Sequence, residues 1–587
     1  MRLHFPSAAA FLLASALGLI SWTVAAPVNL VPEYSASITA VAPGVVLVDF
    51  GRVAIGNLLI TPPAGSSKVV RVHFGESLKN GRIDRKPPGS VRYAVVEMTP
   101  EGTLPLVVAP LADSRNTKQP EAVLTPEAWG VVLPFRWVEI EGWPGELKPG
   151  QISRQSAFAA SWNDADASFH SSDETLNRIW ELCRYSIKAT TFAGVYVDGD
   201  RERISYEADS YLNQLSHYAT SNDIQMARDT FNRLMKLPTW PTEWASHMVF
   251  MAHADWMHTG DVKWLAPRYE ALKKKLLTAR AGDGGLVLSN DKQIKRDDIV
   301  DWPAAERDGY VFTKTNTVVN AFHLRSLMEM SQLAKAVGNE VDASKFTADA
   351  ALALASFQKA FLDPAKGIYR DGIGTDHSSL HANLFPLAFG LVPTGNRKNV
   401  IDWISGRGMA CSVYAAQYLL EGLFENGAAE QAVKLITASG DRSWKHMLDS
   451  GTTITWEAWD QRYKPNQDWN HAWGAAPANL LPRFVIGVQP LAPGWKRARI
   501  RPNPGGLTEA GGTVPTPRGP VRVDWKKGTS FEMSLKLPPD LTAKVELPAA
   551  GGSSGVFVDG KPVAARQEGD WWILEEDISG NATMEVR

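Results

Sequence analysis

Charged side chains crowd one short segment of the chain. Between Asp198 and Asp209, five acids and two arginines fall within twelve residues, just before a stretch with helical periodicity. Guanidinium groups hold neighbouring carboxylates in fixed orientations through paired hydrogen bonds. They also separate the pKa values of such carboxylates, so that one stays protonated and can donate a proton. The pattern indicates acid–base chemistry, and a salt-bridged helix N-terminus is the alternative interpretation.

Tryptophans surround a second group of polar side chains. Glu457 lies between Trp456 and Trp459, and an Asn-His pair ending at His471 follows, so that four tryptophans, this glutamate and this histidine fall within 18 residues. Flat apolar rings with a few polar groups are typical of a pocket for a ligand with apolar faces, such as a sugar. The alternative is an aromatic stripe that faces the core, with Glu457 in solvent.

Two weaker clusters also combine tryptophan with acids, at 240–244 and at 297–302. Three aspartates in the second cluster have the ligand chemistry of a Ca²⁺ site, but such groups are common on protein surfaces, so no metal is predicted. The glycine-rich stretch 551–555 matches a nucleophile-elbow pattern by letter, yet it lies between strand-like runs instead of before a helix. We therefore do not expect a serine nucleophile there.

The composition excludes several classes of protein. The 587 residues include 61 basic and 63 acidic side chains, which gives a net charge of −2. A nucleic-acid-binding protein should be basic, so no nucleic-acid partner is expected. Two cysteines, Cys183 and Cys411, cannot supply a disulfide framework or a thiolate zinc site.

The N-terminus has the features of an export signal. Arg2 precedes an apolar run from Ala8 to Trp22, and small residues follow at 24–26. We predict a signal peptide at residues 1–26 and a secreted or periplasmic protein with no membrane contact in its mature form. The alternative, a membrane anchor, is disfavoured because the run is shorter than the ~20 residues that a span needs.

Three zones position the polar segments. Residues 27–160 alternate apolar and polar side chains in short runs, which predicts an antiparallel β-sandwich. Residues 161–486 change to helical periodicity, and their hairpin-like pairs of helices fit a toroid. Residues 487–587 return to strand-like runs and predict a second β-sandwich, with glycine pairs at 505–506, 511–512 and 551–552 as loops. The further helices expected in the middle zone are at 207–220, 223–236, 245–259, 262–279, 315–337, 342–361, 378–389, 411–425, 428–439 and 471–485.

These segments resemble bacterial α-L-rhamnosidases of glycoside hydrolase family 78 along about 530 residues. The run 200–209 is similar to the family's acid segment, and Thr452 to Trp459 is similar to its base segment. The resemblance implies a central all-α (α/α)6 barrel between N-terminal and C-terminal antiparallel β-sandwiches. It assigns the general acid to Glu202 and the general base to Glu457. It also implies substrate binding by Asp198, Arg203, Tyr206, Asp209, Trp244, Asp301, Trp302, Trp456 and His471.

The implied activity is an inverting exo-glycoside hydrolase that releases terminal α-L-rhamnose from a glycoside or polysaccharide, with no cofactor. The chain departs from the family at Tyr206, where a tryptophan is usual, and at Asp198, which stands four residues before Glu202 instead of six. Asp198 or Asp200 therefore remains an alternative acid. Two other functions stay open: another six-hairpin glycosidase or a uronate lyase with Tyr206 and His471 as base and acid, and a non-catalytic carbohydrate-binding protein.

Overall fold

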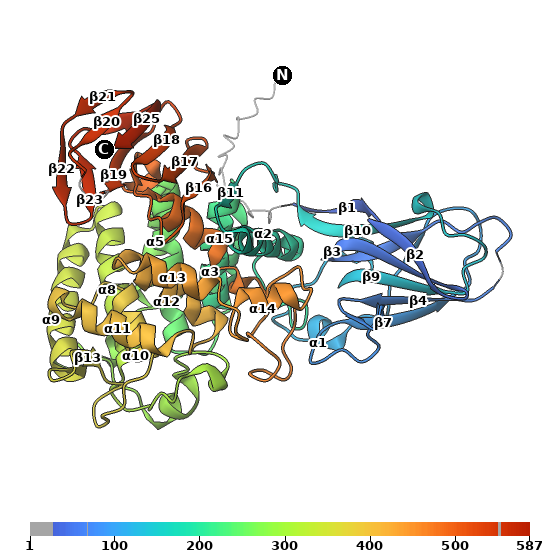
Figure 1. Ribbon diagram of the computed structural model, residues 1–587. Helices are drawn as coiled ribbons and strands as arrows, with labels where there is room; N and C mark the ends of the chain where they lie inside the picture. Colours follow the sequence, from blue (N-terminus) through green and yellow to red (C-terminus); the bar gives the residue numbers. More distant parts are fainter. Residues whose placement is uncertain (1–26, 67, 550–552) are drawn as a thin grey trace, which may run out of the picture.

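The computed structural model describes residues 27–66, 68–549 and 553–587 (Figure 1). The predicted signal peptide at 1–26 and the glycine pair 551–552 lie outside the described residues. An N-terminal β-domain projects from one side of a helical central domain, and a C-terminal β-domain covers one end of the helices. Within the described part of the chain, no helix has the length and apolar character needed to cross a membrane.

The N-terminal domain is built on an eight-stranded sheet in the order β1-β10-β3-β9-β4-β7, with β2 and β8 also paired to β3. Alternate residues of its central strands point into an apolar core, where the rings of Phe74 and Phe135 meet edge to face at 5.1 Å between centroids. The strands are β1 (Val28–Tyr34), β2 (Ser37–Ala42), β3 (Val45–Ile60), β4 (Val70–Gly75), β7 (Tyr93–Met98), β8 (Leu106–Val108), β9 (Leu133–Glu141) and β10 (Ile152–Ala159).

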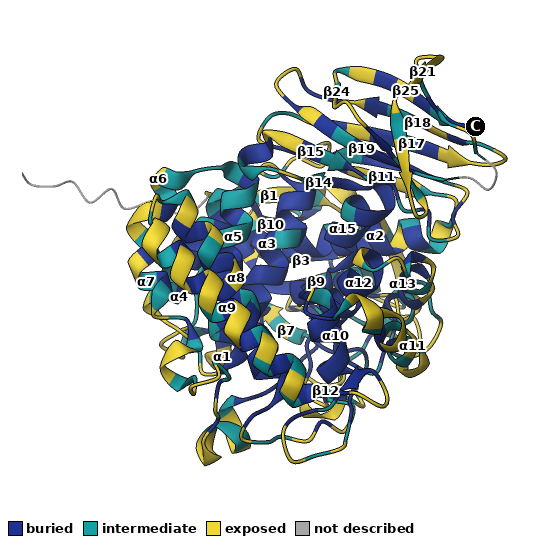
Figure 2. Cartoon of the chain, turned by 90° about the vertical axis from the view of Figure 1, so that its left-hand side faces the viewer, coloured by how far each residue is buried: buried dark blue, intermediate teal, exposed yellow. Residues whose placement is uncertain are grey.

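The helices of the central domain differ in how completely they are buried. Almost every residue of α3 (Glu207–Thr220) and α12 (Val413–Glu425) is buried, whereas α9 (Glu340–Phe361) buries a stripe with three- and four-residue spacing. Such a stripe is typical of an outer helix that packs on an inner one. Figure 2 shows this contrast: α9 has exposed yellow segments, whereas α3 and α12 are mostly dark blue.

Other long helices complete the domain, and α11 and α14 among them had no predicted counterpart. The helices are α2 (Glu174–Ala189), α4 (Gln225–Lys236), α5 (His247–Thr259), α8 (Thr317–Ala336), α10 (His381–Ala388), α11 (Arg397–Arg407), α13 (Ala429–Ile436) and α14 (Trp444–Asp449).

Two predicted helices are interrupted. The range 262–279 contains only short elements, α6 (Val262–Leu265), a 3-10 turn and α7 (Tyr269–Lys273), because Pro267 lacks the N–H that a continuous helix requires. The range 471–485 is divided in the same way into a 3-10 turn, α15 (Pro477–Leu480) and a π-helical turn that contains Pro482.

The C-terminal domain consists of two larger sheets. One has seven strands in the order β11-β16-β17-β18-β25-β20-β21, and the other has six, β14-β15-β19-β23-β22 with β24 on β19. The strands are β14 (Val488–Pro490), β15 (Arg497–Ile500), β16 (Glu509–Val514), β17 (Val521–Lys527), β18 (Phe531–Lys536), β19 (Thr542–Pro548), β20 (Val556–Val558), β21 (Lys561–Val563), β22 (Ala565–Glu568), β23 (Trp571–Leu574), β24 (Ile578–Ser579) and β25 (Asn581–Val586).

Strand β11 (Ser168–Ser171) joins this C-terminal sheet although it precedes all the long helices in the chain. It pairs antiparallel with β16, where the glycines 511–512 form part of the strand and not the predicted loop. A Cβ on Gly512 would lie 2.0 Å from the carbonyl O of Ser168. The glycines are therefore required by the close approach of two backbones.

Candidate active site

One arginine side chain joins the two carboxylates that the sequence singles out. The Arg201 guanidinium donates to both oxygens of Glu457, Nη1 to Oε2 at 2.7 Å and Nη2 to Oε1 at 3.1 Å. Its Nε lies 3.3 Å from Oε1 of Glu202. The Nζ of Lys464 adds a second cation 3.2 Å from Glu457. Two segments more than 250 residues apart thus meet at a single charged cluster.

Gly199 allows the segment that carries Glu202 to approach the segment that follows Glu457. It has a φ of 145°, and a Cβ there would lie 2.9 Å from Oδ2 of Asp468 and 3.0 Å from the carbonyl O of Asn470. The loop is tied down by the amide of Asp200, which donates to Oδ1 of Asn470 at 2.7 Å. The loop before α3 and the loop before α15 are therefore in direct contact, which brings Glu202 and Glu457 to the same guanidinium.

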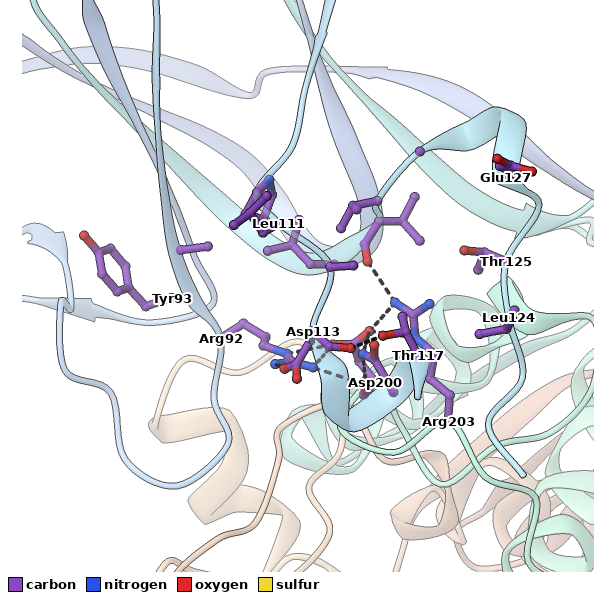
Figure 3. A pocket seen from close by; sticks show the side chains of 18 residues that line it. Arg92, Tyr93, Leu111, Asp113, Thr117, Leu124, Thr125, Glu127, Asp200 and Arg203 are labelled. Atoms are coloured by element: carbon purple, nitrogen blue, oxygen red, sulfur yellow. Dashed lines mark hydrogen bonds and ion pairs between the residues drawn. The ribbon is translucent and has the colours of Figure 1, made fainter. Parts of the chain in front are cut away.

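Asp200 and Arg203 contact the N-terminal domain. Arg92 donates to Oδ2 of Asp200 at 2.7 Å, and Arg203 donates to Oδ1 of Asp200 at 2.7 Å and to the carbonyl O of Val132 at 2.8 Å. Both residues line a cavity of about 640 Å³ between the two domains (Figure 3). The prediction that Arg203 binds the substrate beside Glu202 is corrected: it anchors the loop to the N-terminal domain. Asp200, held by two arginines, is removed as an alternative acid.

Glu202 and Asp198 differ in access to solvent. The Glu202 side chain is 29% exposed, whereas Asp198 is 2% exposed and accepts from the backbone N–H of Ile204. Burial, first of all, raises the pKa of Asp198 well above its usual range, and the nearby acids Glu202 and Asp468 raise it further. Asp198 is thus a buried residue near Glu202, and Glu202 is the more accessible of the two carboxyl groups. Tyr206 donates its hydroxyl to Oε2 of Glu202 at 3.2 Å.

His471 forms a buried charged unit with two aspartates. Its Nε2 lies 2.7 Å from Oδ1 of Asp209, and its Nδ1 lies 3.5 Å from Oδ1 of Asp468. Burial opposes the charge on the ring, but the hydrogen bond to Asp209 and the adjacent Asp468 carboxylate raise the pKa of His471 to about 10. The unit ties the start of α3 to the loop that carries Glu457. Binding of sugar hydroxyls by Asp209 and His471 stays a prediction.

Aromatic rings border the charged cluster on two sides. The rings of Trp456 and Trp469 stack with centroids 4.7 Å apart, and Tyr206 meets Trp244 edge to face at 5.7 Å. The ammonium of Lys464 lies 5.3 Å above the ring of Trp302. Trp456 precedes Glu457 in the chain, and Tyr206 contacts Glu202. Apolar walls for a substrate at these rings stay a prediction.

Asp301 does not fit its predicted role. Its carboxylate accepts from Nε2 of His381 at 2.6 Å, from the backbone N–H of Ser412 at 2.9 Å and from the Ser412 hydroxyl. It also accepts from the backbone N–H of Trp302, so no oxygen is left for a sugar hydroxyl. Its accessible surface is zero. The prediction of substrate binding is corrected: Asp301 holds the start of α12 in place.

Models of three domain families match the chain in order. Residues 39–158 match the bacterial α-L-rhamnosidase concanavalin-like domain, residues 164–485 the bacterial α-L-rhamnosidase six-hairpin glycosidase domain, and residues 487–560 the bacterial α-L-rhamnosidase C-terminal domain. The second match alone covers more than half of the chain. The chain belongs to the bacterial α-L-rhamnosidase family. The predicted resemblance to glycoside hydrolase family 78 is thereby confirmed.

Curated relatives of this rhamnosidase-family chain are considerably longer than it is. An α-L-rhamnosidase of Formosa agariphila is 24% identical over 72% of the chain and 48% of the relative, and one of an Alteromonas species is 23% identical over 87% of the chain and 57% of the relative. The chain spans about half the length of these relatives.

Solved structures of α-L-rhamnosidases share its fold. The structure from Dictyoglumus thermophilum matches 96% of the chain and 64% of its own length with a TM-score of 0.79 at 20% identity. The Streptomyces avermitilis enzyme, solved with L-rhamnose, matches 96% of the chain and 54% of its own length with a TM-score of 0.77 at 19% identity. This similarity extends through both β-domains and the helical domain.

Three residues of the candidate site were not assigned from the sequence: Arg201, Lys464 and Asp468. Arg201 was visible as part of the acidic segment, and Asp468 as part of the tryptophan-rich one. Lys464 lies in a polar loop with no distinguishing pattern. Ligand atoms of Glu457, Asp468 and His471 lie within 4.8 Å of one another, which is close enough to hold a metal ion. Two cations, Arg201 and Lys464, already contact Glu457 there.

Proposed function

We propose that this protein is an exported, inverting exo-α-L-rhamnosidase that acts on a rhamnosylated glycoside or polysaccharide. One observation carries the proposal: a single guanidinium, that of Arg201, contacts both Glu202 and Glu457. Two carboxylates on different edges of one guanidinium are near each other without touching. An inverting glycosidase needs about 6.5–9.5 Å between its two carboxyl groups, because a water molecule must fit between the base and the sugar.

The roles of the two carboxylates follow from their surroundings. Glu202 is the accessible carboxyl beside a phenol, and it would donate its proton to the glycosidic oxygen as the bond from that oxygen to the anomeric carbon breaks. Glu457 would take a proton from the water whose oxygen bonds to the opposite face of that carbon. Arg201 and Lys464 hold the Glu457 carboxylate in a fixed orientation toward the water. The products are free L-rhamnose and the protonated leaving group.

Two further parts of the proposal concern the fold of the helical domain and the export of the protein. An inner layer of fully buried helices with amphipathic helices outside supports an (α/α)6 barrel of the six-hairpin type. Export to the periplasm or medium is supported by the apolar N-terminal run, which precedes the first described strand.

The lyase alternative loses support at Tyr206. A lyase needs this phenol as a base, but burial and the neighbouring acids raise the pKa of Tyr206 far above its usual range. The hydroxyl already donates to Glu202, which is the opposite of accepting a proton. His471, clamped between two aspartates, is likewise poorly placed to lend its proton to a substrate.

The test replaces each carboxylate by its amide. Glu202→Gln and Glu457→Gln should each lower kcat on 4-nitrophenyl or disaccharide α-L-rhamnosides by about 10²–10⁴-fold. The exposed Glu340→Gln is the matched control and should turn over normally. NMR of the first product should show the β-anomer of L-rhamnose. Release of the α-anomer, or normal turnover in either amide variant, would contradict the mechanism.

A further inference from the structure

A groove on the acid side of the site has no role in the mechanism above. It has a volume of about 510 Å³ and lies between the start of α3 and the end of α4. We call it the acid-side groove and define it by six of its lining residues: Glu121, Tyr206, Arg233, Lys236, Leu237 and Trp240.

Tyr206 connects this groove to the catalytic acid. Its ring lines the groove, and its hydroxyl donates to Glu202 at 3.2 Å. A general acid must reach the glycosidic oxygen, which belongs to the leaving group after cleavage. The groove, which Tyr206 separates from Glu202, is therefore assigned to the leaving-group side of the site.

Two cations on α4 face the groove without a carboxylate partner. Arg233 and Lys236 lie three residues apart and so share one side of the helix. Arg233 donates to the backbone carbonyl of Glu121, and among the described residues neither cation forms an ion pair with an acid. Burial lowers the pKa of Arg233, and the distant Glu121 carboxylate offsets this only in part. A half-buried guanidinium without an anion is suited to bind one from a ligand.

Apolar side chains form the rest of the groove surface. Leu237 and Trp240 are each 46% exposed, which is unusual for such large apolar groups. An exposed indole beside cations suits a sugar ring, since the ring packs its C–H face on the indole while its polar groups reach the charges. The groove thus combines a platform for a sugar with positive charge for an acid group.

We propose that the acid-side groove binds a uronic acid residue as the leaving group, with its carboxylate on Arg233 and Lys236 and its ring on Trp240. The substrate class would be an α-L-rhamnosyl uronate, within an oligosaccharide or at a chain end. This inference rests on the proposed function and specifies the substrate for it.

Two disaccharides test directly whether the groove recognises the carboxylate of the leaving group. Initial rates should be measured on α-L-rhamnosyl-(1→4)-D-glucuronic acid and on α-L-rhamnosyl-(1→4)-D-glucose, which differ only at the carboxylate. Wild type should favour the uronate by about tenfold or more in kcat/KM, mostly through KM, since one charge-assisted hydrogen bond corresponds to roughly this factor. In Arg233→Met/Lys236→Met the ratio should fall to near one.

Lys335→Met is the matched control. Lys335 is exposed in the last turn of α8, as Lys236 is in the last turn of α4, so both substitutions remove one charge near a helix C-terminus. This control should keep the wild-type ratio. A wild-type ratio near one, or equal loss on both disaccharides in the double variant, would overturn the proposal.

A binding measurement separates this inference from the proposed function. Calorimetric titration of wild type with free D-glucuronate and D-glucose should show weak binding of the uronate alone, and the double variant should lose it. If no rhamnoside is cleaved but glucuronate binds as described, the proposed function fails and the groove assignment stands. If the aryl rhamnoside is cleaved and neither the ratio nor the titration responds to Arg233 and Lys236, the groove assignment fails alone.

Discussion

Asp209→Asn tests whether the buried ion pair with His471 stabilises the folded protein. The pKa of His471 is raised from about 6.5 to about 10, and the hydrogen bond to Asp209 is the largest favourable cause. Each pKa unit corresponds to about 1.4 kcal/mol. Loss of about two of these units in Asp209→Asn would correspond to about 2–3 kcal/mol. The amide keeps the shape of the side chain and removes its charge.

The sign of the pH dependence follows from the direction of the shift. Because the folded pKa lies above the unfolded one, the stabilisation is complete below about pH 6.5 and disappears as the pH rises through about 10. The difference in unfolding free energy between wild type and Asp209→Asn should therefore be about 2–3 kcal/mol at pH 6. It should shrink to roughly half near pH 9.

Urea unfolding followed by tryptophan fluorescence at pH 6, 7, 8, 9 and 10 measures this difference. Asp402→Asn is the control, because Asp402 makes an exposed ion pair with Lys398 on α11. That substitution should cost less than about 0.5 kcal/mol at every pH. A cost for Asp209→Asn that stays constant from pH 6 to 10, or grows with pH, would refute the account of His471 as a buried cation.

Two further substitutions probe the contacts that assemble the site. Gly199→Ala places a Cβ 2.9 Å from Asp468 and strains the backbone. We therefore expect about 1–3 kcal/mol lower stability and at least tenfold lower kcat/KM on an aryl rhamnoside. Unchanged kinetics would contradict this account of Gly199. Asp301→Ala leaves the buried donors of His381 and Ser412 unpaired and should cost about 3–5 kcal/mol in thermal or urea unfolding. Asp301→Asn, which keeps one acceptor, should cost less, and an equal cost would point to packing instead.

Local periodicity was sufficient to predict most helices, because amphipathic stripes such as that of α9 depend on sequence spacing alone. It overestimated the helices at 262–279 and 471–485, where apolar spacing continues but prolines remove backbone donors. Glycines 511–512 were misinterpreted because the reason for them is a strand more than 300 residues away. Information about that neighbour is absent from the local sequence.

In the candidate site, too, some features were predictable from the local sequence and others depend on distant residues. The surrounding residues singled out the segments of Glu202 and Glu457, and the family resemblance singled out the two glutamates, which both contact Arg201 in the structure. Asp301 was misassigned because a buried carboxylate that holds a helix start and one that binds a sugar have the same local sequence. The role of Lys464 depends on a long loop folding back, which no periodicity encodes.

Strand β11 sets an order of events during synthesis. Its partner β16 begins about 340 residues later in the chain, so at 5–20 residues per second the ribosome needs roughly 17–70 seconds to produce it. For that interval β11 exposes unpaired backbone groups, which are an aggregation risk. The C-terminal sheet is also incomplete in any fragment that lacks residues 168–171. The seven-stranded sheet therefore cannot be completed until residues from both ends of the helical domain have been synthesised.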